Sequence, residues 1–363
     1  MNISIITPVL LEGDAVSNDV RGMYRALKRA GHEVKLFAEE CHADLPFGPI
    51  GKASEWLGPD DCCIYHHSMG CGAGVALLRT LKCRKLVRYH GVTPAHHYQD
   101  DLKTRLECNK GVYQLRVLAE MGCEFIATTN FTARDLLAVQ ADAPLAIVSP
   151  YNQIDALFQA TPDYLSPLRY SDAIYNVLVV GRVVPNKNLL KAARAFTIFQ
   201  EEVRGRARLL IVGDPGDFRY ARQVLASANE LGNADSVFVV GKVSLRQLRA
   251  YYLLADALLL VSEHEGFGVP LVEAMAMRVP AVASATTALP ETGGDAVLYA
   301  DPADEEAIAA ALGRAVSDLD LREELMICGW ERYRERFAND KIDQAIQETV
   351  FDYRGERVTP FQT

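Results

Sequence analysis

The sequence predicts an α/β protein with two parallel sheets, and three observations support this prediction. Short β-branched runs alternate with amphipathic helical stretches, as in strands that are joined by crossover helices. The alternation breaks near the middle of the chain and then starts again. The chain has 363 residues, which is long enough for two hydrophobic cores. We therefore expect two Rossmann-like domains.

The first half begins with a strand at 3–6, a loop that contains Gly13, and a helix over 21–29. Gly31 follows that helix, where a glycine commonly ends a helix in the left-handed conformation. Further strands of this half are expected at 33–37, 62–65, 85–89 and 125–128.

The second half repeats the pattern, and most of its strands end in a glycine or a polar loop. Its strands are expected at 176–180, 208–212, 237–240, 257–261 and 279–283. Ligands of open α/β sheets bind at the carboxyl ends of the strands, so these loops are the first place to look for a site.

The domain boundary is expected between residues 158 and 171, where prolines and polar residues interrupt the periodicity. We place the N-terminal domain at 1–165 and the C-terminal domain at 166–340. Residues 341–363 are expected to form a last helix and a tail that cross back to the N-terminal domain.

Composition and charge argue against several classes of protein. The formal net charge of -9 disfavours nucleic-acid binding, which usually depends on a basic surface. None of the eight cysteines forms a C-x-x-C pair, so they are expected to be reduced and buried. The N-terminus lacks a basic flank, and no apolar run approaches the ~20 residues that span a bilayer. We therefore expect a cytoplasmic protein, with peripheral membrane association as an option.

One local stretch is basic, and it allows two interpretations. The favoured one is a solvated helix end that leads into a strand. The other is a docking patch for an anionic lipid surface or a lipid-diphosphate acceptor. The stretch consists of Arg79, Lys82, Arg84, Lys85 and Arg88.

The most informative motif runs over 262–275, after a buried strand and into a helix. Pro270 occupies the expected first helical position, and Gly266 and Gly268 allow the backbone to approach a ligand closely. The N–H groups of such a helix start favour an anion. Glu265 in the loop and Glu273 in the first turn are expected to face one pocket, where carboxylates could accept hydrogen bonds from sugar hydroxyls.

Two further stretches follow strands. Gly181 to Asn188 contains Arg182 and Lys187, whose charges could clamp a diphosphate. His90 ends a strand of the N-terminal half and would reach the same crevice if the two domains face each other. The sequence supports no metal site, since a single His-Asp pair is too little evidence for one. The glycines of 70–74 do not have the dinucleotide spacing, which excludes a nicotinamide dehydrogenase.

Together these motifs resemble family four of the retaining glycosyltransferases, which has the GT-B architecture of two Rossmann-like domains. Glu265 and Glu273 match the family's E-x7-E motif, and Gly181, Arg182, Lys187 and Asn188 match its G-R-x4-K-N element. The segments 212–214 (Val-Gly-Asp) and 290–292 (Pro-Glu-Thr) fit as well. The segment 89–94 is similar to a stretch of a subgroup that assembles bacterial surface polysaccharides.

The resemblance implies roles for individual residues. Arg182 and Lys187 would neutralise the donor diphosphate, Glu273 would bind the ribose, and Glu265 would hold hydroxyls of the transferred sugar. His90 would contact the donor sugar. The remaining donor-binding positions would be Gly13, Gly181, Gly213, Gly266, Phe267, Gly268 and Val269.

The resemblance also implies the reaction, in which a hexose moves with retention from a nucleotide-diphosphate sugar to a saccharide acceptor, without a metal or cofactor. UDP-glucose and GDP-mannose are the leading donors, and a lipid-linked saccharide is the expected acceptor. Two alternatives stay open: a sugar-nucleotide epimerase of the same fold, and a non-catalytic nucleotide-sugar-binding partner. The second would be expected to lack Arg182, Lys187 or Glu265, and all three are present.

Overall fold

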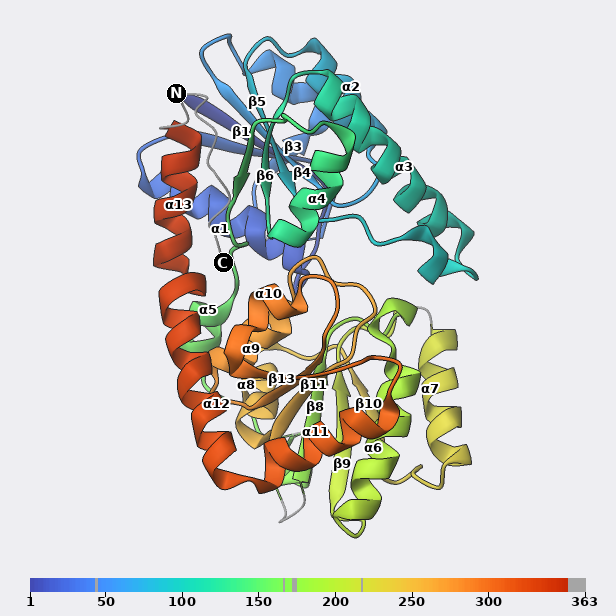
Figure 1. Ribbon diagram of the computed structural model, residues 1–363. Coiled ribbons are helices and arrows are strands. Elements are labelled where there is room, and N and C mark those ends of the chain that lie inside the picture. The colour runs from blue at the N-terminus through green and yellow to red at the C-terminus, as the bar shows by residue number, and fades with distance from the viewer. Residues whose placement is uncertain (43–44, 166, 172–174, 217, 352–363) are drawn as a thin grey trace. The chain divides into compact units, whose positions relative to one another are not determined.

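The computed structural model describes residues 1–42, 45–165, 167–171, 175–216 and 218–351. The chain divides into two compact units, which are coloured from blue to green and from green to orange in Figure 1. Unit 1 consists of Met1–Asn152 and the C-terminal segment that begins at Phe337. Unit 2 consists of Gln153–Arg336.

Unit 1 is built on a parallel sheet whose seven described strands run in the order β3-β2-β1-β4-β5-β6-β7. The strands are β1 Asn2–Leu10, β2 Glu33–Cys41, β3 Phe47–Pro49, β4 Cys62–His67, β5 Arg84–Tyr89, β6 Glu124–Ala127 and β7 Leu145–Ile147. Its α-helices are α1 Ala15–Arg29, α2 Gly72–Thr80, α3 Leu102–Glu120, α4 Asn130–Val139 and α13 Asn339–Phe351.

Both faces of this sheet are buried, because apolar residues occupy consecutive positions along its strands. In β4, Cys63 and Tyr65 lie in one apolar layer, whereas Ile64 lies in the other. The second layer also holds apolar residues of α1 and the stripe Ile342, Ile346 and Val350 of α13. Helix α13, red in Figure 1, therefore completes the core of unit 1 although it follows unit 2 in the sequence.

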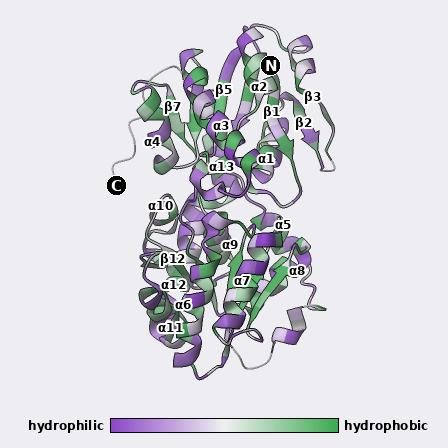
Figure 2. Ribbon diagram, turned by 90° about the vertical axis from the view of Figure 1, so that its right-hand side faces the viewer, coloured by the Kyte–Doolittle hydropathy of each residue, from purple (hydrophilic) through white to green (hydrophobic). Residues whose placement is uncertain are grey.

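Unit 2 repeats the architecture with a parallel sheet whose six described strands run in the order β10-β9-β8-β11-β12-β13. The strands are β8 Tyr175–Val180, β9 Ala207–Val212, β10 Val237–Gly241, β11 Ala257–Leu260, β12 Ala281–Ser284 and β13 Val297–Ala300. Its α-helices are α5 Ile154–Gln159, α6 Leu189–Glu202, α7 Phe218–Glu230, α8 Leu245–Leu254, α9 Val269–Ala276, α10 Leu289–Gly293, α11 Glu305–Ser317 and α12 Leu319–Arg332. Figure 2 shows hydrophobic residues along its strands, while helices such as α7 carry both hydrophobic and hydrophilic residues.

The division lies earlier in the chain than the boundary expected at 165/166. Helix α5 belongs to unit 2 because Arg249 of α8 donates hydrogen bonds to the carbonyl oxygens of Phe158 (2.5 Å) and Ala160 (2.6 Å). The ring of Phe158 also packs edge-on against Trp330 and Tyr333 at the end of this unit. The polar, proline-containing stretch after α5 is thus a loop within unit 2. The expected tail, from residue 352 onward, lies outside the described residues.

Helix α1 begins earlier than expected, at Ala15 instead of residue 21. Asp14 caps it, since the Asp14 carboxylate accepts hydrogen bonds from the backbone N–H (2.9 Å) and the hydroxyl (3.0 Å) of Ser17. This cap places the next turn of the helix, with Asp19, against the sheet, and Asp19 is fully buried. Three short strands at the edges of the sheets, β3, β7 and β13, were not expected from the sequence.

Candidate functional site

Two loops meet at the carboxyl ends of β8 and β11, which are neighbours in the sheet of unit 2. The loop after β8 spans 181–188, and the loop after β11 spans 261–268. The backbone N–H of Glu263 donates to the carbonyl oxygen of Asn186 (2.9 Å), and the amide of Asn186 donates to the carbonyl oxygen of His264 (3.2 Å). These bonds hold the two motifs beside each other, as the sequence predicted.

Lys187 and Glu265 form an ion pair between the two loops. The contact joins Lys187 Nζ to Glu265 Oε1, which also accepts a hydrogen bond from the hydroxyl of Ser262 (2.8 Å). Both side chains are mostly buried, at 17% and 12% exposure, so solvent screens this pair only weakly. The hydroxyl of Thr287 accepts a hydrogen bond from the backbone N–H of Glu265 (3.2 Å), which also helps to hold this loop in place.

Arg182 lies on the same loop as Lys187 but remains exposed. Within the described residues, its guanidinium forms no hydrogen bond or ion pair, and it lies near the loop after β9: a Cβ atom at Gly216 would be 3.9 Å from Nη2. Together with Lys187 and Gly181, it lines a small cavity whose floor is formed by apolar residues of β8 and β11. Two cations therefore flank this cavity.

Gly181 and Gly213 allow the turns after β8 and β9 to touch. A Cβ atom at Gly213 would lie 1.9 Å from the carbonyl oxygen of Gly181, and both glycines have positive φ angles, of 155° and 143°. The backbone N–H of Gly181 donates to the carbonyl oxygen of Val212 (3.0 Å) across this contact. Their role in the structure is thus close backbone packing beneath the cationic loop.

The start of helix α9 is defined by Gly268, which has a φ of 94°. A Cβ atom there would lie 2.7 Å from Leu289 Cδ2, so both the backbone angle and the space require glycine. Phe267 is buried, and its carbonyl oxygen accepts a hydrogen bond from the hydroxyl of Thr292 (2.6 Å). Val269 is the first helical residue, so Pro270 lies one position later than expected.

Glu273 has different hydrogen-bond partners from Glu265, and the expectation that both face one pocket stays a prediction. Glu273 is the fifth residue of α9 and only 2% exposed. Its carboxylate accepts hydrogen bonds from the hydroxyl of Tyr252 (2.7 Å) and the amide of Gln153 (3.2 Å). Burial raises the pKa of Glu273, and these two bonds partly oppose that shift. The sequence had pointed to neither partner, because α5 and α8 carry no recognisable motif.

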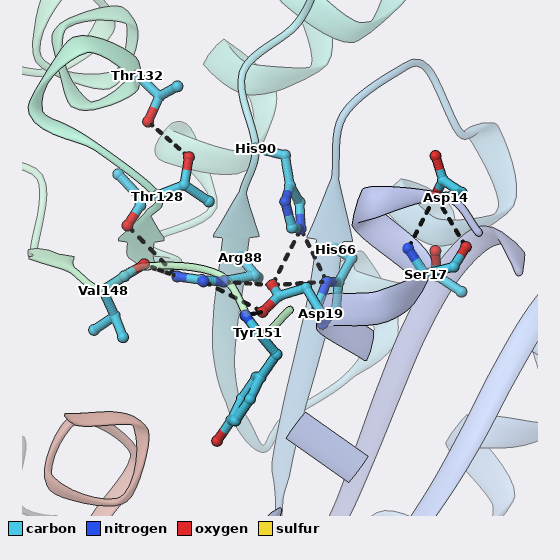
Figure 3. Close-up of polar contacts among 12 residues, drawn as sticks. Asp14, Ser17, Asp19, His66, Arg88, His90, Thr128, Thr132, Val148 and Tyr151 are labelled. Atoms are coloured by element: carbon cyan, nitrogen blue, oxygen red, sulfur yellow. Dashed lines mark hydrogen bonds and ion pairs between the residues drawn. The ribbon is translucent and has the colours of Figure 1, made fainter. Parts of the chain in front are cut away.

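His90 follows β5 in unit 1 and belongs to a buried polar cluster with Asp19, His66 and Arg88 (Figure 3). His90 Nε2 lies 3.0 Å from His66 Nδ1 and 3.5 Å from Asp19 Oδ2. Arg88 Nε donates to Asp19 Oδ2 (2.8 Å), and both side chains are fully buried. The sequence named His90 but missed this cluster, since its members come from α1, β4 and β5.

The spacing of Asp19, His66 and His90 would also suit three ligands of a metal ion. Arg88 opposes that use, because its guanidinium already neutralises Asp19 and would repel a second cation. The absence of a metal requirement therefore stays a prediction.

Gly13 lies in the exposed loop between β1 and α1, with a φ of 76°, and a Cβ atom there would meet nothing within 4 Å.

Two residues of the basic stretch cannot serve as a docking patch. Arg88 is buried, and Arg84 forms an ion pair with Glu124 (2.7 Å) and donates to the carbonyl oxygens of Thr349 and Val350 in α13. Arg79 and Lys82 are exposed, which agrees with a solvated helix end. No helix in the described ranges is long and apolar enough to cross a membrane.

Residues 172–327 match the family described as glycosyl transferases group 1. The chain is 35% identical over 147 residues to "O-antigen chain mannosyltransferase B" of Escherichia coli, covering 40% of this chain and 38% of that protein. It is 26% identical over 288 residues to "O-antigen chain mannosyltransferase RfbU" of Salmonella typhimurium, covering 78% of this chain and 71% of that protein.

Solved structures show the same fold over nearly the whole chain. A glycosyltransferase from Rickettsia africae superimposes with a TM-score of 0.75 at 17% identity, covering 98% of this chain and 99% of that one. WaaG, a glycosyltransferase involved in lipopolysaccharide biosynthesis, gives a TM-score of 0.71 at 14% identity, covering 95% and 98%. The second half of the chain is therefore similar to this glycosyltransferase family, and the whole chain has the two-domain GT-B fold that its motifs predicted.

Proposed function

We propose that this protein transfers a hexose from a nucleotide-diphosphate sugar to a saccharide acceptor. The observation that carries this proposal is the junction of the two loops in unit 2, where Lys187, Arg182 and Glu265 surround the carboxyl ends of β8 and β11. Parallel sheets bind ligands at this edge, and the start of helix α9 adds backbone N–H groups that favour an anion.

In this proposal the ion pair between Lys187 and Glu265 rearranges when the donor binds. The diphosphate takes the place of Glu265 as the partner of Lys187, with Arg182 as the second cation. Glu265 then becomes available to accept hydrogen bonds from hydroxyls of the donor sugar. Without a ligand, the pair keeps both charges compensated, so the site does not bury a lone charge.

The chemistry requires stabilisation of the charge that develops on the leaving diphosphate. Two cations that are paired with the bound donor and a helix N-terminus provide it, and they need not reorganise during the reaction. We propose that no metal or cofactor is needed and that transfer proceeds with retention on one face of the sugar. A phosphate oxygen of the donor would accept the proton of the acceptor hydroxyl.

For the donor, we propose GDP-mannose ahead of UDP-glucose. Support comes from the two relatives named O-antigen chain mannosyltransferases, one of which aligns with most of the chain. A thermal-shift panel of nucleoside diphosphates and their sugars, with EDTA present, tests this directly. A ligand that binds only the folded protein raises Tm by mass action. A shift with UDP-glucose alone would exclude the mannose donor.

Turnover assays test the site itself. We expect Lys187→Ala and Arg182→Ala each to reduce turnover by on the order of 10²-fold, as for other lost electrostatic donors. Arg194→Ala, at an exposed cation of α6 paired with Glu305, serves as the control and should remain active. Donor conversion without an acceptor would favour the epimerase, and donor binding without any turnover would favour the binding partner.

For the acceptor, we propose a lipid-linked saccharide reached at a membrane surface. Support comes from α3, where Leu106 (57% exposed), Val112 (56%) and Tyr113 (68%) are apolar and accessible. Lys103 and Arg116 on the same helix are exposed cations, which suit anionic headgroups. This surface replaces the basic stretch considered from the sequence.

Sedimentation with phosphatidylglycerol vesicles tests the membrane proposal. We expect the double variant Leu106→Gln/Tyr113→Gln to lose most of the binding, since apolar area in the interface contributes to affinity. Leu225→Gln, at an exposed leucine of α7, is the matched control and should bind like the wild type. Equal binding of all three proteins, or none by the wild type, would refute the role of α3.

A further inference from the structure

Asp19 and His66 are buried polar residues of unit 1 for which the proposed function has no direct use. Both contact the one histidine that the family motif singles out, His90. His66 is fully buried, and its Nε2 has no hydrogen-bond partner. Such an orphaned atom constrains where the ring proton of His66 can lie.

A buried N–H group without an acceptor is rare and costly, whereas an unpaired lone pair is better tolerated. His66 Nε2 should therefore carry the lone pair, which leaves the proton of the neutral ring on Nδ1. That proton points at His90 Nε2, 3.0 Å away. The hydrogen bond thus runs from His66 to His90, and His90 Nε2 is its acceptor.

We infer that Asp19 and His66 are positioning residues that hold His90 as a neutral hydrogen-bond donor, with its proton on Nδ1. Because Nε2 accepts from His66, the neutral ring of His90 must carry its own proton on Nδ1. Within the described part of the chain, Nδ1 of His90 forms no hydrogen bond, and it is not among the buried unpaired atoms. It is therefore the atom that a ligand can reach.

Asp19 helps to hold the two histidine rings in place, because its carboxylate is itself held by hydrogen bonds. Its Oδ1 accepts the backbone N–H of Tyr151 (2.8 Å), and its Oδ2 accepts from Arg88 Nε, so neither oxygen can turn away. Arg88 also donates to the carbonyl oxygen of Val148 (2.7 Å), which ties the ion pair to the chain after β7. Figure 3 shows both imidazole rings directed at the carboxylate that this network immobilises.

The charges around the rings favour their neutral forms. Asp19 lies 3.5 Å from His90 Nε2 and 3.8 Å from His66 Nδ1, but Arg88 compensates its charge. Burial lowers the pKa of His66 to about 4 and the pKa of His90 well below its usual value. Asp19 alone opposes these shifts, while Arg88 and the neighbouring histidines add to the lowering for His90.

This inference rests on the proposed function and specifies how His90 serves it. A neutral ring with the proton on Nδ1 donates to an oxygen of the donor substrate, a sugar hydroxyl or a phosphate oxygen. It cannot accept the proton of the acceptor hydroxyl at that atom, so His90 is not the general base. The nucleotide-sugar oxygen that it contacts is thus a hydrogen-bond acceptor.

Nitrogen-15 NMR of the full-length protein with labelled histidines tests the inference without any substrate. Two-bond proton–nitrogen correlations distinguish the tautomers, and the His90→Gln and His66→Gln variants assign the two rings. At pH 7 we expect both rings to be neutral with the proton on Nδ1, and unchanged by one equivalent of Zn²⁺. A proton on His90 Nε2, a cationic His90, or zinc ligation would overturn the inference.

Kinetics give an independent readout in the presence of donor and acceptor. His66→Phe should lower kcat by on the order of 10-fold, since it removes the bond that orients His90. His66→Asn should recover most of this loss, because its amide can donate near the position of Nδ1. His67→Phe is the control, since the His67 side chain is equally buried but bonds to the carbonyl oxygen of Gly111, and only its backbone carbonyl contacts His90. Equal losses in all three variants would indicate a purely structural role.

The two experiments separate this inference from the proposed function. A wild-type protein that transfers no sugar would refute the proposed function, while the NMR spectrum would still report the tautomers of His66 and His90. A wild-type protein that is active but has the other tautomer of His90 would refute the inference alone.

Discussion

Unit 1 should be destabilised by mild acid, whereas unit 2 should not. Burial lowers the pKa of both His66 and His67 from 6.5 to about 4. In the unfolded chain these rings take up protons as the pH falls below 6.5, but in the folded unit they stay neutral. The unfolded state therefore binds more protons, and the stability of unit 1 decreases from about pH 6.5 down to about pH 4.

The magnitude follows from the size of the shifts. One pKa unit corresponds to ~1.4 kcal/mol, so each histidine should cost unit 1 roughly 2 kcal/mol between pH 7 and pH 5. His66 and His67 together give about 4 kcal/mol, a large part of the stability of a typical domain, and His90, whose pKa burial also lowers, adds to the loss in the same direction. Asp135 offsets a little of this, since burial raises its pKa. In unit 2 the raised pKa of Glu273 acts in the opposite direction, so that unit gains stability on acidification.

The chain offers a direct assay, because its two tryptophans lie in different units. Trp330→Phe leaves Trp56 as the reporter of unit 1, and Trp56→Phe leaves Trp330 as the reporter of unit 2. Urea unfolding of both variants at pH 7 and pH 5 should show the loss only with Trp56. His67→Phe should remove roughly 2 kcal/mol of this loss by the same arithmetic. Equal losses in both units, or none in unit 1, would refute the reasoning.

Three substitutions test the close contacts described above by urea unfolding. Gly213→Ala should destabilise unit 2 by about 3 kcal/mol or more, because the new methyl group would overlap the carbonyl oxygen of Gly181; a stable variant would contradict the geometry. Gly268→Ala should cost about 1–3 kcal/mol from its positive φ and weaken donor binding as well. Arg88→Leu should cost unit 1 about 3–5 kcal/mol, since it leaves Asp19 charged and buried, and Asp19→Asn in the same chain should restore part of that loss.

The sequence predicted well what depends on local patterns. Alternating apolar segments indicated both parallel sheets, and the glycine and charge spacing identified the loops that meet at Lys187 and Glu265. The short edge strands β3, β7 and β13 were missed, whereas β11 and β12, which are also only four residues long, were expected because each lies within a longer apolar run.

Features that depend on distant segments were not predictable. Arg88 looked like one of several surface cations, and only the folded chain brings Asp19 of α1 against it. The partners of Glu273 were not predicted either, because Tyr252 and Gln153 come from α8 and the start of α5, which carry no motif. The unit boundary shifted for the same reason, since a single arginine of α8 binds the end of α5.

The return of α13 to unit 1 has a consequence for biosynthesis. Residues 1–152 leave the ribosome first, but the apolar layer beneath α1 stays open until Ile342, Ile346 and Val350 have been made. Unit 2 is continuous in sequence and can complete its core earlier. The nascent chain thus carries an uncovered hydrophobic surface while all of unit 2 is being translated, and during that interval it is a natural client for a chaperone that binds apolar segments.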